Sequence, residues 1–285
     1  MVNVSLKYGL ILLLLIGCEK EPNETPTKGY LKCYVDESLF NLIKEEAELF
    51  MSLYPDTKID LVSVKAREGI VALLNKETEI FIGSRQFNDE EKKFIEKTKF
   101  DVELYKFCYD GIAIISNKNS HLDKIYLPDL KEILNSPTPR MKIVMPDKNS
   151  GVYEYITTNL VKEEYLKNVE IVPGEYDVIK KVINSQNTIG FVGLNTLKGI
   201  DNIKILKVGV WDNNINGINY YLPYNAYLVN GTYPLYRTTY ILLSEVGLGV
   251  ASGFTSFLTG NDGQKLVMKN DLGPATVPVK LIQIN

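Results

Sequence analysis

Short β-forming runs and helical patterns alternate along most of this chain. Runs rich in β-branched and aromatic residues predict strands at residues 31–35, 58–64, 79–83, 142–145, 169–172, 188–193, 204–210, 233–243 and 276–284. Apolar residues spaced three or four apart predict helices at residues 38–54, 68–75, 88–97, 127–134, 152–161, 177–184, 246–259 and 262–268. Alternation on this scale predicts an α/β architecture with mainly parallel sheets.

Two local signals add detail to this pattern. Asn88 and Glu91 have the spacing of a capping box, in which each side chain bonds to the backbone N–H of the other residue at the start of a helix. Residues 212–219, DNNINGIN, are rich in turn formers and predict a loop.

Residues 105–117, YKFCYDGIAIISN, lie where the first part of this alternation ends and the second begins. The β-forming residues of this run are interrupted by Asp110 and Gly111. A buried strand that carries such a polar pair suits a crossover between two lobes, where the backbone comes close to a ligand. We therefore interpret the run as a hinge strand, and a single buried strand with a glycine bulge is the alternative.

The N-terminus has the features of an export signal. Lys7 precedes an apolar run at residues 8–17, which is about half of the roughly 20 residues that a membrane-spanning helix needs. Residues 15–18, LIGC, resemble the bacterial lipobox, which predicts a signal peptide at residues 1–17 and a lipid on Cys18. Residues 18–28 then predict a polar, disordered tether. A signal sequence with an incidental cysteine is the alternative.

Charge and composition exclude several classes of function. Removal of residues 1–17 takes away one positive charge and changes the formal net charge from −3 to −4, so nucleic acid is not an expected partner. His121 is the only histidine, which argues against a zinc centre, any other metal site and a Ser-His-Asp triad. Cys33 and Cys108 lie in strand-like runs and are expected to be free thiols, although two exported cysteines could also pair.

Polar, hydroxyl-bearing junctions follow three of the predicted strands. They are Asp36-Glu37-Ser38, Gly83-Ser84-Arg85 and Asp147-Lys148-Asn149-Ser150-Gly151. In open α/β sheets, ligands bind beyond the carboxyl ends of the strands, and free N–H groups at a helix start favour an anion. Each junction by itself is also explained as an ordinary helix cap. Their recurrence in both halves, with Arg85 in one of them, predicts a shared oxyanion site.

The sequence resembles the phosphate-binding-protein-like lipoproteins of phosphate ABC transporters, in the form found in bacteria of the Bacteroidetes type. The resemblance covers residues 30–275 and is carried by an ordered set of short motifs. These are YVDESL at 34–39, YPDTKI at 54–59, IGSRQFNDEE at 82–91, YDGIAIISN at 109–117, TIGFVG at 188–193, YPLYRTTYIL at 233–242 and FTSFLTGNDGQKLV at 254–267.

The resemblance implies a type II periplasmic-binding-protein fold, with two α/β lobes joined by two hinge crossovers and phosphate bound between them. Lobe I would comprise residues 29–112 and 232–285, and lobe II residues 113–231. The site residues that it implies are the hydroxyl donors Ser38, Ser84 and Ser150, the backbone donors Asn149 and Gly151, the charge-balancing Arg85, and Asp36 or Asp110 as the acceptor of a phosphate proton.

Three positions depart from the better-known members of that family. The first loop is Asp36-Glu37-Ser38 where those members are rich in Thr or Ser. The third loop, DKNSGV at residues 147–152, contains no arginine, and Arg85 stands where an aspartate is often found. Asp36 and Asp110 are equally explained as residues that cap or turn the backbone.

The sequence therefore predicts a lipid-anchored solute-binding protein of the cell envelope, facing the periplasm or the exterior. It would be a monomer that needs no cofactor, performs no catalysis, binds inorganic phosphate and delivers it to an inner-membrane ABC permease with its ATPase. One alternative is a binding protein for another oxyanion or a small anionic metabolite. Others are an exported phosphate-ester hydrolase, which lacks a visible nucleophile–base pair, and a non-transport interaction module that has lost the site.

Overall fold

The computed structural model describes residues 24–138, 140–245 and 247–276 of the chain. The predicted signal peptide, residues 18–23 of the predicted tether and residues 277–284 of the last predicted strand lie outside this part. The end of the tether is ordered where disorder was predicted, because Thr25 and Lys28 exchange backbone hydrogen bonds (2.8 and 3.2 Å). Within it, no helix has both the length and the apolar character that crossing a bilayer requires.

The described chain alternates strands with helices as the sequence predicts. The strands are β1 (Gly29–Asp36), β2 (Thr57–Val64), β3 (Ile80–Gly83), β4 (Glu103–Asn117), β5 (Lys124–Tyr126), β6 (Lys142–Pro146), β7 (Val169–Val172), β8 (Thr188–Gly193), β9 (Ile203–Ile205), β10 (Lys207–Asp212), β11 (Gly217–Tyr221), β12 (Tyr236–Leu243) and β13 (Gly273–Pro274). The α-helices are α1 (Phe40–Leu53), α2 (Ala66–Leu74), α3 (Asp89–Thr98), α4 (Leu127–Asn135), α5 (Gly151–Asn159), α6 (Glu175–Ile183), α7 (Asn225–Val229), α8 (Val250–Thr259) and α9 (Asn261–Lys269). Three 3-10 turns, η1 (Glu37–Leu39), η2 (Glu163–Tyr165) and η3 (Leu194–Leu197), complete the set.

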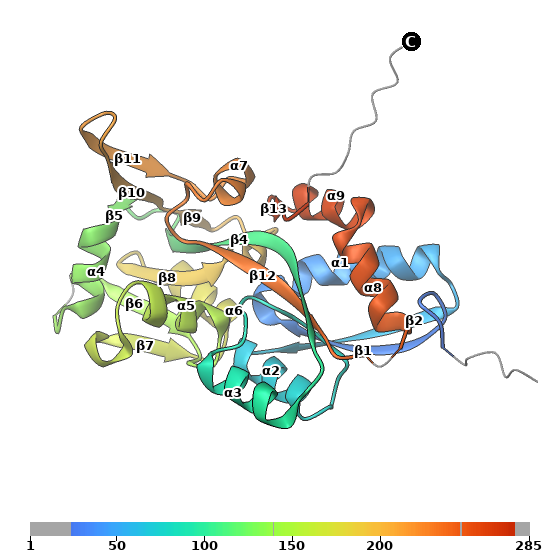
Figure 1. Cartoon of the computed structure of the whole chain (residues 1–285). Coiled ribbons are helices and arrows are strands. Elements are labelled where there is room, and N and C mark those ends of the chain that lie inside the picture. The colour runs from blue at the N-terminus through green and yellow to red at the C-terminus, as the bar shows by residue number, and fades with distance from the viewer. Residues whose placement is uncertain (1–23, 139, 246, 277–285) are drawn as a thin grey trace, which may run out of the picture.

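Most strands join one extended sheet, whose order is β2-β1-β3-β12-β4-β8-β6-β7, with β13 and β9 also paired to β4. The strands β1, β2 and β3 are parallel to one another, and so are β6, β7 and β8, whereas β4 and β12 run antiparallel to their neighbours. In Figure 1, α1 and α8 lie on one side of β1 and β2 and α2 on the other, and α4, α5 and α6 surround β6 to β8. Parallel strands covered by helices confirm the predicted α/β fold.

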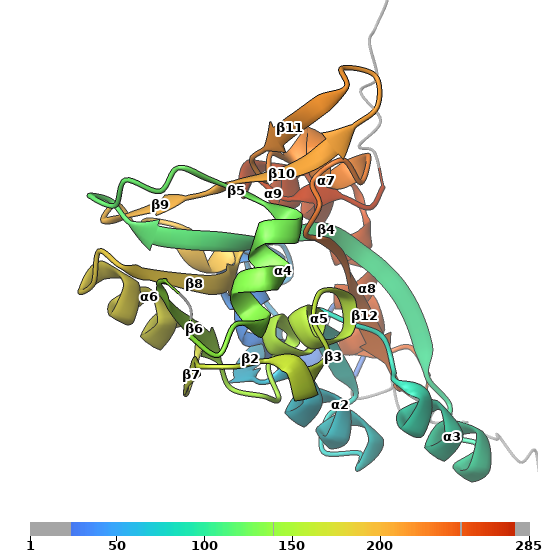
Figure 2. The same ribbon diagram turned by 90° about the vertical axis from the view of Figure 1, so that its left-hand side faces the viewer.

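The strand β4 joins the two halves of this sheet, as its long, bent ribbon in Figure 2 shows. Its residues up to Gly111 pair with β12, and from Ile112 onward it pairs with β8 and β9. The register between β4 and β12 shifts beside Thr239, whose hydroxyl accepts from the N–H of Cys108 (3.1 Å) and donates to its carbonyl (2.9 Å). The predicted hinge stretch therefore contains a change of partners next to Gly111 and a bulge next to Cys108.

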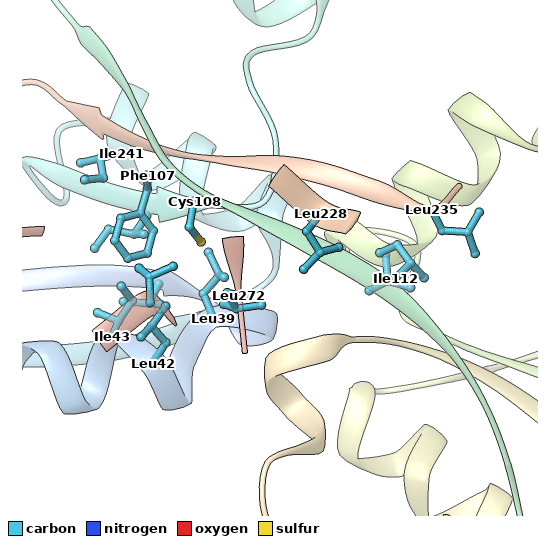
Figure 3. Close-up of a cluster of buried hydrophobic side chains, with 14 of the residues drawn as sticks. Leu39, Leu42, Ile43, Phe107, Cys108, Ile112, Leu228, Leu235, Ile241 and Leu272 are labelled. Carbon is cyan, nitrogen blue, oxygen red and sulfur yellow. The ribbon is translucent and has the colours of Figure 1, made fainter. Parts of the chain in front are cut away.

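The main hydrophobic core extends along β4 (Figure 3). Near one end, Phe107 and Cys108 lie above the side chains that η1 and α1 contribute. Farther along the strand, Ile112 lies near Leu228 and Leu235, which belong to the chain returning toward β12. Cys108 and Cys33 are both buried and free, as the sequence favoured. One continuous core thus supports both halves of the sheet.

Two predicted elements differ from the structure. Residues 204–210 form two strands instead of one, because the chain leaves β4 after β9 and then pairs with β5 and β11 as β10. The chain changes its pairing partner at buried Leu206, whose N–H still bonds to the carbonyl of Ile114 on β4 (2.8 Å). The predicted loop at 212–219 is the turn of the β10–β11 hairpin, where Asn216 has the left-handed φ of 47° that asparagine tolerates.

Candidate functional site

The two junctions that follow β1 and β3 meet because these strands are adjacent and parallel. Asp36, the last residue of β1, accepts hydrogen bonds from the backbone N–H of Ser38 (3.0 Å) and that of Ser84 (3.3 Å). The hydroxyl of Ser84 also donates to Asp36, and all three side chains are buried. A carboxylate that takes three donors from two loops fixes the distance between those loops.

The junction after β6 faces this pair from the other half of the sheet. Buried Ser150 caps α5, and its hydroxyl accepts from the backbone N–H of Tyr153 (3.1 Å). A Cβ atom added to Gly151 would lie 1.8 Å from the hydroxyl oxygen of Ser84, so only glycine allows this approach. Asn149 lies beside them, and its carbonyl accepts from the backbone N–H of Arg67 in α2 (3.1 Å). The structure therefore brings all three predicted junctions together.

Asp110 lies on β4 at the base of the same region and is paired with Arg237 of β12. The carboxylate accepts from Nε (2.9 Å) and from Nη2 (2.6 Å) of Arg237, and both side chains are buried. Burial raises the pKa of the Asp110 carboxyl, and the nearby guanidinium of Arg237 opposes that shift. The remaining nitrogen, Nη1 of Arg237, is buried and has no hydrogen-bond partner among the described residues. The two N–H donors of this nitrogen are thus unused among the described residues.

Glu175 adds a third carboxyl group to the region. It is the first residue of α6, and it accepts from the hydroxyls of Ser38 and Thr196 (2.5 Å each) and from the N–H of Gly193 (2.8 Å). Burial raises the pKa of this carboxyl, and the positive charge of Arg237 opposes the shift. A Cβ added to Gly193 would lie 2.9 Å from Nη2 of Arg237, so this arginine and the Glu175 bonds occupy one continuous site.

Arg85 is paired with two carboxylates of neighbouring helices. Its guanidinium forms a two-pronged ion pair with Glu91 of α3 (2.7 and 2.9 Å), and its Nε pairs with Glu154 of α5. The pKa of Arg85 is raised, because these two carboxylates outweigh the effect of burial. The role of Arg85 at the site stays a prediction, and the arginine whose guanidinium lies near Gly193 and Ser38 is Arg237.

Sequence reasoning missed Arg237 and Glu175. The signal for Arg237 was a single arginine inside an otherwise β-forming run, because a charge in a buried strand needs a buried partner. Glu175 gave no comparable signal, since an acidic residue in the first turn of a helix is explained by the helix dipole alone. In the described part of the chain, no three His, Cys, Asp or Glu side chains are grouped so that they could hold a metal ion.

Comparison with known proteins gives one consistent result. The profile of the PBP superfamily domain matches residues 20–262. The phosphate-binding protein PstS of Staphylococcus saprophyticus is 24% identical over 283 residues, which cover 94% of this chain and 87% of that protein. PstS of Pseudomonas aeruginosa is 22% identical over 288 residues, covering 90% of this chain and 85% of its own length.

A solved structure from Clostridium perfringens has the same fold. It is described as a phosphate ABC transporter substrate-binding protein with bound phosphate, and it superposes with a TM-score of 0.74 at 22% identity over 87% of this chain and 100% of that one. This likeness supports the type II arrangement expected from the sequence. Because the family profile matches residues 20–262 of the 285 in the sequence, this chain belongs to the PBP superfamily.

Proposed function

We propose that this chain is the lipid-anchored solute-binding protein of an ABC transporter and that it captures inorganic phosphate. The observation that carries the proposal is the meeting of Ser38, Ser84 and Gly151, with the guanidinium of Arg237 near Ser38 and its Nη1 without a partner among the described residues. Hydroxyl groups, backbone N–H groups at a helix start and a guanidinium together are the donors that an oxyanion needs. The names of the PstS relatives, and the phosphate held by the Clostridium perfringens structure, favour phosphate among oxyanions.

The binding cleft would lie between lobe I (29–112 and 232–285) and lobe II (113–231). The chain passes between these parts through β4 and again before β12, where the N–H of Ile112 bonds to the carbonyl of Leu235 (2.9 Å). Polar contacts cross the boundary between the lobes. The N–H of Leu42 donates a hydrogen bond to the side chain of Asn195 (3.0 Å), and Lys198 forms an ion pair with Glu45. Polar contacts of this kind can exchange with water, so they suit lobes that open and close around a ligand.

The predicted export signal supports the proposed anchor, and the family supports the proposed partners. Lipid on Cys18 would hold the protein at the membrane surface, with residues 18–28 as the tether, so that it faces the periplasm or the exterior. The loaded, closed form of a monomer would dock on an inner-membrane permease. Delivery of the ligand requires only that the closed form binds it more tightly than the open form does, so neither catalysis nor a cofactor is needed.

Calorimetric titration of phosphate-stripped residues 19–285 tests the proposal. We expect saturable phosphate binding, no binding of sulfate, and at least about tenfold weaker phosphate binding in Ser38→Ala, because a hydrogen bond to a charged ligand contributes about 1.5–3 kcal/mol. Ser52→Ala, which changes an exposed serine of α1, is the matched control and should bind as the parent does. Competition by sulfate would indicate another oxyanion as the ligand, and absence of heat with every oxyanion would refute the proposal.

One observation favours a second candidate, an interaction module that has lost the binding site. The donors of Ser38 and Ser84 are already bonded to Asp36 and Glu175 in the structure. Absence of ligand binding, with the fold intact, would support this candidate.

A further inference from the structure

At the candidate site, the donors of Ser38 and Ser84 are bonded to carboxylates of the chain itself. On the lobe I side, Asp36 takes the N–H of Ser38, the N–H of Ser84 and the hydroxyl of Ser84. These are two backbone donors and one hydroxyl donor at the ends of two adjacent strands. An incoming oxyanion would have to share or replace the oxygens of Asp36 to use them.

Glu175 bonds the two lobes to each other. It belongs to α6 in lobe II, and two of its donors, Gly193 N–H and the Thr196 hydroxyl, come from the same lobe. Its third donor is the hydroxyl of Ser38 in lobe I, at 2.5 Å. The carboxylate thus takes a hydroxyl from one side and two donors from the other, which is what an anion bound between closing lobes would do.

The two lobes are in close contact where the junctions meet. A Cβ on Gly151 of lobe II would lie 1.8 Å from the Ser84 hydroxyl oxygen and 3.0 Å from Oδ2 of Asp36, both in lobe I. Together Asp36, Asp110 and Glu175 contribute three buried carboxyl groups against the single guanidinium of Arg237. A phosphate anion entering beside these carboxyl groups would come too close to atoms of the chain and would be repelled by their negative charge.

We propose that Glu175 acts as an internal anion. It holds the lobes closed when the site is empty, and phosphate binds only by displacing it from Ser38, Thr196 and Gly193. The affinity part of this inference rests on the proposed phosphate function. The closure part does not, because it concerns the protein without ligand.

Small-angle X-ray scattering of ligand-free residues 19–285 tests closure. The parent protein is expected to have the radius of gyration of the closed structure and to keep it when phosphate is added. Glu175→Ala removes the bonds to all three donors and is expected to increase the radius of gyration. The isosteric Glu175→Gln should do so less, since its amide oxygen still accepts. Glu164→Gln, an exposed change in η2 of the same lobe, is the matched control. Circular dichroism confirms that each variant is folded.

Calorimetry with inorganic phosphate tests displacement. Glu175→Ala should bind phosphate at least about tenfold more tightly than the parent, since the freed donors then serve the ligand alone. If the variant opens while neither form binds phosphate, the internal anion is supported and the phosphate proposal fails. If the parent binds phosphate and Glu175→Ala binds it more weakly, the internal anion is refuted and the phosphate proposal stands. A ligand-free variant as compact as the parent also refutes the internal anion, and the phosphate proposal is then decided by the titration of the parent alone.

Discussion

Glu46 lies on the buried face of α1, and its replacement by glutamine should remove a large pH dependence from the stability of the fold. Neither of its carboxyl oxygens has a hydrogen-bond partner among the described residues. Burial raises the pKa of this carboxyl from its ordinary value of 4.5 to about 9, and the neighbouring Glu45 adds to the shift. Glu46 is therefore neutral in the folded protein at neutral pH and ionised in the unfolded chain.

The sign of the effect follows from proton binding. Between the unfolded pKa of 4.5 and the folded pKa of about 9, the folded state holds a proton that the unfolded state has lost. The free energy of unfolding therefore falls as pH rises through this window, by about 1.4 kcal/mol per pH unit. Over about three units, from about pH 5 to about pH 8, the loss amounts to about 4 kcal/mol.

Urea unfolding of the parent and of Glu46→Gln at these two pH values measures the effect. The stability difference between the two proteins should shift by about 4 kcal/mol in favour of the variant at the higher pH, while other titrating groups cancel in the subtraction. Glu48→Gln, an exposed change on the same helix, should show no such shift. A difference for Glu46→Gln that is the same at both pH values would show that the carboxyl is not held neutral by burial.

Two further predictions concern buried groups of the fold. Arg237→Ala leaves the buried carboxylate of Asp110 without its partner and should lower the free energy of unfolding by about 3–5 kcal/mol, as measured by urea denaturation; a loss below about 1 kcal/mol, typical of an exposed pair, would contradict the buried pairing. Burial raises the pKa of the thiols of Cys33 and Cys108. Residues 19–285 should therefore react with a thiol reagent only after unfolding, and should then consume two equivalents of the reagent per chain. Absence of reaction in denaturant without reductant would instead indicate a disulfide.

Local patterns were sufficient where the structure depends on residues near one another in the chain. The capping box of Asn88 and Glu91 forms as predicted, with the N–H of each residue bonded to the side chain of the other (2.7 and 2.9 Å). The elements that sequence reasoning missed or merged are short, such as β5, β9 and α7. Their residues gain their hydrogen bonds or their burial from distant segments, so periodicity within the segment carries little information about them.

The sequence by itself determined the α/β alternation, the placement of Ser38, Ser84 and Ser150 at strand ends, and the membership of a known family. These follow because a repeating pattern specifies each element, and because the carboxyl ends of adjacent parallel strands meet at one edge. Only the tertiary structure decided which charges the site contains. Asp110 pairs with Arg237 across 127 residues, and Ser38 bonds to Glu175 across 137. Such partners are chosen by which side chains the packed sheet buries together, because a buried charge must be paired where it lies, whatever its distance along the chain.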